Sequence, residues 1–196
     1  MSPRISAPTV AEHRVRQHAA LMTAARALLL EQGAAAVTPR AVGAAAGLAR
    51  SSVYEYFPTA GDLLAELAVD AFARWTATVR TAVEAEDAGW PRVDAYLRTS
   101  LRLVADGEHK MAGALAGAQL PASCRTELVR LHGELAAPLR AAFDELAVPD
   151  AELGVALVQG LLDAATREVE AGADVTMVSE ATVRLVRHGL RPNPSG

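Results

Sequence analysis

Apolar residues recur at three- and four-residue steps along almost the whole chain, and the alternation of apolar and polar residues typical of a β-strand is nowhere sustained. Spacing of this kind gathers the apolar side chains on one face of a helix. Alanine, the strongest helix former, is abundant, and clusters of β-branched residues are few. The pattern therefore predicts an all-α protein.

The first predicted helix covers about residues 11–32. Gly33 follows it, and glycine is common just beyond a helix C-terminus because it adopts the left-handed conformation without strain. The apolar face of this helix is expected to hold Val15, Ala19, Met22, Ala25 and Leu29.

Two short helices joined by a tight turn follow, and together they predict a helix-turn-helix. Thr38 can cap the first of them and Pro39 suits its first position, where the missing N–H removes no hydrogen bond. The turn contains Gly47, and the second helix runs from Ala49 to Phe57, where Pro58 ends it. In this motif the second helix enters the DNA major groove and the first braces it. The contacts between the two helices are expected from Val42, Ala45, Leu48 and Val53.

Polar and aromatic side chains on this segment are candidate DNA contacts. Arginine can bind guanine or phosphate, serine can bind a base edge or phosphate, and tyrosine hydroxyls commonly bind the backbone. The helix N-terminus at Thr38 favours a phosphate. The residues expected to contact DNA are Thr38, Pro39, Arg40, Ala49, Arg50, Ser51, Ser52, Tyr54, Glu55 and Tyr56.

Charge is distributed unevenly along the chain. The net charge of −4 by itself argues against a nucleic-acid-binding protein. Residues 1–60, however, carry six arginines and three glutamates, which gives +3 and leaves −7 for the remainder. The asymmetry suggests a small basic head on an acidic body, although chance clustering of surface arginines explains it equally well.

The rest of the chain predicts a second, larger helical domain. Glycines and prolines divide it into segments, and Pro138 lies inside one of them, where it predicts a kink or a break. The expected domains are 1–61 for the DNA-binding head, with residues 1–10 flexible, and 62–196 for the body. The expected body helices cover about residues 62–85, 93–104, 111–120, 123–146, 151–171 and 174–189.

The last two predicted helices are apolar over so much of their circumference that they require cover on more than one side. A single-chain helical core and a symmetric dimer are the two ways to provide this cover. The residues expected at a dimer interface are Leu157, Leu161, Ala164, Val178, Val183, Leu185 and Val186.

Bulky residues and a few polar groups on the body helices are candidates for a small-molecule pocket. Such pockets combine mostly apolar walls with a few polar groups, although bulky residues at helical spacing more often form ordinary core. The candidate lining residues are Phe72, Trp75, Tyr96, Leu97, Leu101, Met111, Leu115, Gln119, Phe143, Gln159 and Asp163.

The sequence contains none of the catalytic or metal patterns sought in it. The five histidines are scattered, and the His-Glu-x-x-His, phosphate-loop and Gly-x-Ser-x-Gly patterns do not occur. Cys124 is the single cysteine, which excludes an internal disulfide and is expected to be a small buried thiol. No apolar run is long enough to span a membrane, and the first residues lack the apolar segment of a secretory signal. We therefore expect a cytoplasmic, non-enzymatic protein without metal or cofactor.

The segment from Ala20 to Leu67 resembles the DNA-binding region of the tetracycline-repressor (TetR) family. The features that carry the resemblance are Ala24-Ala25 and Leu28-Leu29 before Gly33, then Thr38, the turn ending in Ala46-Gly47-Leu48, the string Val53-Tyr54-Glu55-Tyr56-Phe57-Pro58, and Leu63-Leu64. The resemblance implies a transcriptional regulator that dimerises through a four-helix interface, binds double-stranded DNA, and carries a small-molecule site in its body. We expect a repressor that a small, largely apolar effector releases from a palindromic operator.

Two positions depart from the family pattern. Ala49 stands where the family usually has a capping serine, and the loss of such a cap costs about 1 kcal/mol. Ala60 stands where a lysine often binds phosphate, and Gly61 weakens the same helix start. An all-helical ligand-binding protein with weakened or lost DNA binding is therefore the alternative function, and a helical enzyme is a third.

Overall fold

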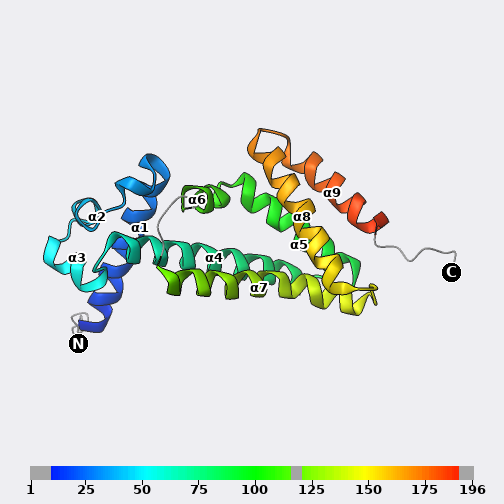
Figure 1. Cartoon of the computed structure of the whole chain (residues 1–196), viewed down its shortest axis with the longest axis horizontal. Helices are drawn as coiled ribbons and strands as arrows, with labels where there is room; N and C mark the ends of the chain where they lie inside the picture. The colour runs from blue at the N-terminus through cyan, green and yellow to red at the C-terminus, as the bar shows by residue number, and fades with distance from the viewer. Residues whose placement is uncertain (1–9, 116–120, 190–196) are drawn as a thin grey trace, which may run out of the picture. The chain divides into compact units, whose positions relative to one another are not determined.

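The computed structural model describes residues 10–115 and 121–189, and it confirms the all-α prediction because these residues form helices and turns without a strand (Figure 1). The helices are α1 (Val10–Gln32), the 3-10 helix η1 (Ala34–Ala36), α2 (Pro39–Ala46), α3 (Arg50–Tyr56), α4 (Ala60–Glu84), α5 (Trp90–Ala105), α6 (Glu108–Leu115), α7 (Ala122–Glu145), α8 (Ala151–Glu170) and α9 (Val175–Gly189). The predicted continuation of α6 to residue 120 lies outside the described residues.

The helix bounds follow the sequence pattern closely, with two instructive differences. Helix α5 begins at Trp90 rather than near residue 93, because Pro91 fits in its first turn. The N–H groups of a first turn make no hydrogen bond within the helix, so a proline there costs none. Helix α7 continues through Pro138, so the predicted break at this proline is wrong. Packing on neighbouring helices can hold a helix together where one backbone hydrogen bond is lost.

The chain divides into two compact units. The first, which we call the head, contains Met1–Ala68 and Gly113–Cys124, and the second, the body, contains Val69–Ala112 and Arg125–Gly196. Helices α4, α6 and α7 therefore contribute residues to both units. The expected domain boundary after residue 61 falls in the first turn of α4, and it stays a prediction.

The buried face of α1 starts further along the helix than the apolar pattern predicted. Leu21, Ala25 and Leu29 are almost completely buried at four-residue steps, whereas Val15 is 69% exposed and Ala19 is also exposed. Toward the N-terminus the same face continues through His18, whose ring lies 5.6 Å from that of Phe57. Polar residues thus extend a face that the apolar pattern alone could not identify.

Helices α2 and α3 pack closely because α2 carries a glycine at the contact. A Cβ atom on Gly43 would lie 2.7 Å from Cγ2 of Val53 and 3.3 Å from the carbonyl oxygen of Leu48. Val42 and Val53 are buried as predicted, but Ala45 is exposed, so its predicted contact is wrong. Glycine, rather than alanine, therefore permits the close approach.

The turn between α2 and α3 also depends on a glycine. Gly47 has φ 68° and ψ 27°, the left-handed conformation that side-chain-bearing residues rarely adopt. Its N–H bonds the carbonyl of Ala44 at 3.3 Å, and the N–H of Leu48 bonds that of Gly43 at 2.9 Å. These bonds satisfy carbonyls at the end of α2 and direct the chain into α3.

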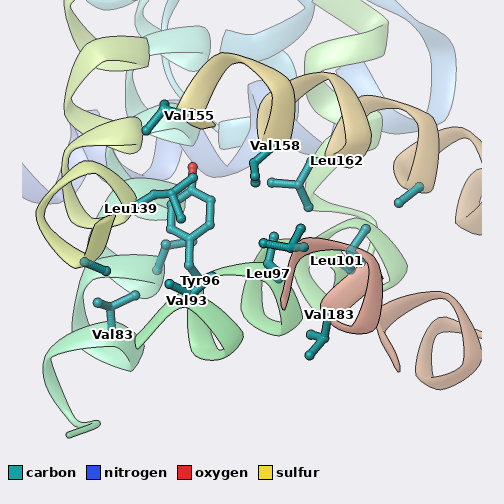
Figure 2. Close-up of a cluster of buried hydrophobic side chains, with 14 of the residues drawn as sticks. Val83, Val93, Tyr96, Leu97, Leu101, Leu139, Val155, Val158, Leu162 and Val183 are labelled. Carbon is teal, nitrogen blue, oxygen red and sulfur yellow. The ribbon is translucent and has the colours of Figure 1, made fainter. Parts of the chain in front are cut away.

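The body has its own hydrophobic core, to which α5, α8 and α9 contribute (Figure 2). Tyr96, Leu97 and Leu101 of α5 are fully buried there, and one stripe of α8 packs with them. The stripe consists of Val155, Val158, Leu162, Ala165 and Val169. This side of α8 is therefore covered by the chain itself.

Ion pairs fasten α9 to α5 beside this core. The guanidinium of Arg187 donates from Nε and Nη2 to the carboxylate of Asp94, at 2.9 and 2.7 Å. It also lies over the ring of Trp90, with Cζ 5.6 Å from the ring centroid. Arg98 pairs with Glu180 one turn further along α5. The fork geometry of arginine thus fixes how α9 lies on α5.

Replacing Gly43 with alanine should destabilise the head. The added Cβ would overlap Val53, and forcing extra atoms into a packed contact costs about 1–3 kcal/mol. Gly133→Ala is the matched control, because Gly133 is exposed inside α7 and its Cβ would meet no atom within 4 Å. The control should gain about 0.5–1 kcal/mol from helix propensity. Urea unfolding followed by circular dichroism measures both, and equal midpoints for Gly43→Ala and wild type would contradict the close contact.

Candidate nucleic-acid interface

The N-terminus of α2 is capped by a side chain. Thr38 has extended angles, and its Oγ1 accepts a hydrogen bond from the N–H of Ala41 at 3.2 Å, which confirms the predicted cap. Arg40 is exposed beside this cap. Pro39 occupies the first turn as predicted, but its ring is buried, so its side chain contributes to packing rather than to the surface.

The start of α3 has no such cap. Ala49 occupies the N-cap position with extended angles and makes no side-chain hydrogen bond. Ser51 and Ser52 do not replace that cap. The orientation of this seven-residue helix therefore depends on contacts made elsewhere along its length.

The start of α4, by contrast, is well capped despite Gly61. Oγ1 of Thr59 accepts from the N–H of Asp62 at 3.1 Å, and Oδ2 of Asp62 accepts from the N–H of Thr59 at 3.0 Å. This reciprocal pair satisfies two backbone donors and places a carboxylate at the positive end of the helix. The weakness expected from Gly61 is thus offset by its neighbours.

Helix α3 presents one face outward and anchors the other. Val53 is fully buried against α2, whereas Arg50, Ser51 and Glu55 are exposed. Tyr54 is 40% exposed, which is high for so large a side chain, and Ser52 is half-buried. Arg50 and Tyr54, like Ser51 and Glu55, are four residues apart and therefore share a face of the helix.

Arg50 and Tyr54 form a preorganised pair on that face. Nη2 of Arg50 donates to the Tyr54 hydroxyl at 3.3 Å, and Cζ of the guanidinium lies 5.3 Å from the ring centroid. The ring restricts the arginine while most of its N–H donors stay available. A stacked, planar guanidinium suits bidentate recognition of a guanine edge or a phosphate.

Tyr56 is turned away from this face. It is half-buried, and its hydroxyl lies 3.1 Å from Oε1 of Gln17 and 3.3 Å from the carbonyl oxygen of Arg14. Sequence reasoning grouped Tyr56 with the DNA contacts and missed Arg14, Gln17 and His18 of α1. Their spacing was the available signal, since Gln17 and His18 lie one turn, and Arg14 two turns, before the buried Leu21 on α1.

The pocket candidates are not brought together in one place. Tyr96, Leu97, Leu101 and Phe143 are fully buried within the body core, and Trp75 packs on that core. The remaining candidates lie elsewhere. The ring of the half-buried Phe72 lies 4.4 Å from that of His132. Met111 and Leu115 are both buried on α6, but they belong to different units. Asp163 is exposed on α8, and Gln119 lies outside the described residues.

One polar pair does lie inside the body core. Nε2 of Gln159 donates to the hydroxyl of Tyr96 at 2.8 Å, and the Tyr96 side chain is 1% exposed. In Figure 2 this hydroxyl points toward α8, among the apolar side chains of the core. The hydroxyl is protonated at neutral pH, and burial raises the pKa of Tyr96 further, to about 12. The proton is therefore available to a hydrogen-bond acceptor.

Outside the buried stripe of α8, further apolar side chains on α8 and α9 are exposed. Leu157 is 64% exposed and Leu185 is 61% exposed, and Leu153 and Met177 are exposed to a similar extent. Leu161, Ala164 and Val178 are half-buried. We call the group Leu153, Leu157, Met177 and Leu185 the α8–α9 patch.

Two residues expected at the dimer interface lie inside the body instead. Val183 and Val186 are each 4% exposed and belong to its core. They are three residues apart and so share a face of α9, whereas Leu185 is on another side. The sequence showed apolar residues around much of α9 but could not assign which side the chain itself covers.

The described residues show no arrangement suited to a metal or a membrane. Between 10–115 and 121–189, no three or more His, Cys, Asp or Glu residues gather as metal ligands, and no helix there is both long and apolar enough to cross a bilayer. Cys124 is buried, as expected, with Sγ 3.8 Å from the carbonyl oxygen of Ala65.

Comparison with known proteins connects this arrangement to a class of regulators. Residues 21–67 match the family model described as bacterial regulatory proteins, tetR family. A search of curated proteins finds no match.

Solved structures share the fold over most of the chain. A protein described as a transcriptional regulator from Pseudomonas aeruginosa PAO1 is 23% identical, with 91% of each chain covered and a TM-score of 0.79. FadR of Bacillus halodurans, a regulator of fatty acid degradation, is 20% identical, with 90% of this chain and 97% of that chain covered and a TM-score of 0.73. FadR of Bacillus subtilis in complex with stearoyl-CoA is 16% identical, with coverages of 89% and 100% and the same TM-score.

These matches confirm the resemblance to the tetracycline-repressor family that the sequence indicated between Ala20 and Leu67. The chain has the fold of these regulators, with a helix-turn-helix in the head and a helical second part. These solved structures are described as transcriptional regulators.

Proposed function

We propose that this protein is a sequence-specific transcriptional regulator, a homodimeric repressor that a small, largely apolar effector releases from a palindromic operator. The observation that carries the proposal is the Arg50–Tyr54 pair on the outward face of α3. A helix-turn-helix reads DNA with the exposed face of its second helix. On α3 the exposed surface holds an oriented guanidinium, Ser51 and a tyrosine hydroxyl, while Val53 is buried against α2.

The start of α2 supplies the accompanying phosphate site. Its first turn, with exposed Thr38 and Arg40, combines the positive end of the helix dipole with a cation. Phosphate contacts of this kind set the register of a protein on DNA, and base contacts supply the specificity. The remaining DNA contacts that we propose are Ala49 through its backbone, Ser52 and Glu55 at the edges of the α3 face.

A homodimer is the second part of the proposal, and the α8–α9 patch supports it. Four large apolar side chains exposed on two adjacent helices are typical of a protein interaction surface. Two-fold symmetry would pair each patch with its copy and present two α3 helices to successive major grooves. Leu161, Ala164 and Val178, which are half-buried, would lie at the same interface.

The effector is the third part. The Tyr96–Gln159 pair supports it, because a hydrogen-bonding group within apolar surroundings can orient a mostly apolar ligand. The B. subtilis relative with stearoyl-CoA shows that a protein of this fold holds a long acyl chain. An effector changes DNA affinity only if it binds one arrangement of the protein better than the other.

Removal of the Arg50 side chain should weaken DNA binding and flatten sequence preference. A lost bidentate base contact costs about 1–3 kcal/mol, so we expect about tenfold weaker binding of Arg50→Ala to a duplex selected by the wild-type protein from a random library. Arg16→Ala removes the same charge from the exposed surface of α1 and should keep the preference. Fluorescence anisotropy over a salt series measures both. Wild-type binding without steep salt dependence and without preference for the selected duplex would support the ligand-binding alternative instead.

A charge placed in the α8–α9 patch should separate the two chains. Leu157→Glu would bury an unpaired carboxylate in the proposed interface, and we expect monomers at concentrations where the wild-type protein is dimeric. Val129→Glu is the control, because Val129 is 74% exposed on α7, outside the patch. Analytical ultracentrifugation gives the masses. A dimer that survives Leu157→Glu, or a monomeric wild type, would refute this interface.

An effector should stabilise the protein and lower its DNA affinity together. Stearoyl-CoA is a suitable first probe, with coenzyme A as the control that lacks the acyl chain. We expect the acyl compound to raise the melting temperature and to weaken binding to the selected duplex, because a ligand stabilises the state to which it binds. Acyl compounds that raise the melting temperature but leave DNA affinity unchanged would argue against the effector mechanism.

A further inference from the structure

The two tyrosines of α3 have different surroundings although only one residue separates them. Tyr54 is exposed and bonds Arg50 of its own helix. Tyr56 is half-buried, and its hydroxyl lies within hydrogen-bond distance of α1, 39 and 42 residues earlier in the chain. The hydroxyl of Tyr56 is thus directed into the head, away from the face that carries Arg50.

Helix α1 surrounds the Tyr56 side chain with three groups. Oε1 of Gln17 and the carbonyl oxygen of Arg14 are both acceptors for the phenol proton, at 3.1 and 3.3 Å. The Arg14 guanidinium lies over the ring, with Cζ 5.4 Å from the centroid. A phenol held both at its hydroxyl and over its ring has little freedom to turn toward DNA.

His18 of α1 makes a second contact with the same end of α3. His18 lies next to both aromatic rings, with centroid distances of 6.0 Å to Tyr56 and 5.6 Å to Phe57. Its Nε2 lies 2.5 Å from Oε1 of Glu66 on α4. The C-terminal end of α3 therefore lies against α1, which is itself paired with α4, while the N-terminus of α3 has no side-chain cap.

We propose that Tyr56 is a positioning residue: through Gln17 and Arg14 it fixes the recognition helix α3 on α1, and it does not contact DNA. We call the contacts of Tyr56 with Gln17 and Arg14 the clamp, and they are present in the free protein. Only the effect of the clamp on DNA recognition rests on the proposed function. A seven-residue helix does not hold its own orientation. Base recognition requires its face to be held in place, so a contact at its far end affects specificity.

The competing assignment makes Tyr56 a phosphate contact. Its hydroxyl would then leave α1 on binding, and Gln17→Ala would not weaken DNA binding. The two assignments therefore differ in what they predict for a residue of α1 that lies away from the exposed face of α3.

Hydrogen exchange in the free, full-length protein tests the clamp without DNA. Tyr56→Phe removes only the hydroxyl, and we expect amide exchange in residues 50–56 to become about two- to tenfold faster, as for the loss of one hydrogen bond. Gln17→Ala should have a smaller effect in the same segment, because the carbonyl of Arg14 remains. The double variant should equal Tyr56→Phe alone, since coupled residues are not additive. Gln17→Glu keeps an acceptor oxygen and should restore protection.

Tyr54→Phe is the matched control, because it makes the same change two residues earlier on the exposed face. It should leave exchange in residues 50–56 as in wild type. Unchanged exchange in Tyr56→Phe, or equal acceleration in Tyr54→Phe, would overturn the clamp.

Affinity for the selected duplex and for a scrambled duplex then tests the consequence. Tyr56→Phe and Gln17→Ala should both lower the ratio of selected to scrambled affinity, by about two- to tenfold for Tyr56→Phe. Tyr56→Phe that weakens both duplexes while Gln17→Ala matches wild type would make Tyr56 a DNA contact and overturn the inference. A wild-type protein without preference for the selected duplex would refute the proposed function alone, and the exchange experiment would still decide the clamp.

Discussion

The packing of the helix-turn-helix depends on the contact between Gly43 and Val53. It brings α2 and α3 closer than a side chain on Gly43 would allow, because a Cβ there would overlap Val53 at 2.7 Å. Val53 is buried on the inner side of α3, and Arg50 and Tyr54 lie exposed beside it. The left-handed Gly47 sets the direction of the turn that precedes them. The chemistry of the exposed face thus follows from a steric fit on the hidden one.

Helices with two different faces recur in both units. In the head, α3 has Val53 against α2, Arg50 and Tyr54 exposed, and Tyr56 against α1. In the body, α8 has Val155 and Val158 in the core and Leu153 and Leu157 exposed. In each case the covered face fixes the helix, and the remaining face is available for a partner. The side chains on that face, polar on α3 and apolar on α8, indicate DNA for the first and a second copy of the chain for the second.

Polar contacts fix orientation in places where apolar packing alone would leave it loose. Asp94 holds Arg187 in a two-pronged pair between α5 and α9, and Gln159 bonds Tyr96 inside the body core. In the head, Oε1 of Gln17 accepts a hydrogen bond from the hydroxyl of Tyr56. Apolar contacts are non-directional, whereas hydrogen bonds depend on angle and distance, so these pairs select one rotation of a helix among several that would bury similar area.

The sequence by itself determined the all-α class, most helix ends and the helix-turn-helix, because periodicity, Thr38 and the glycine stops are local signals. It also showed that α8 and α9 are apolar on more than one side. Only the tertiary structure decided which side is covered: it placed Val183 and Val186 in the core and left Leu157 and Leu185 exposed, and it turned Tyr56 toward α1. Which neighbour covers a face depends on contacts between residues far apart in the chain, and local periodicity does not encode those contacts.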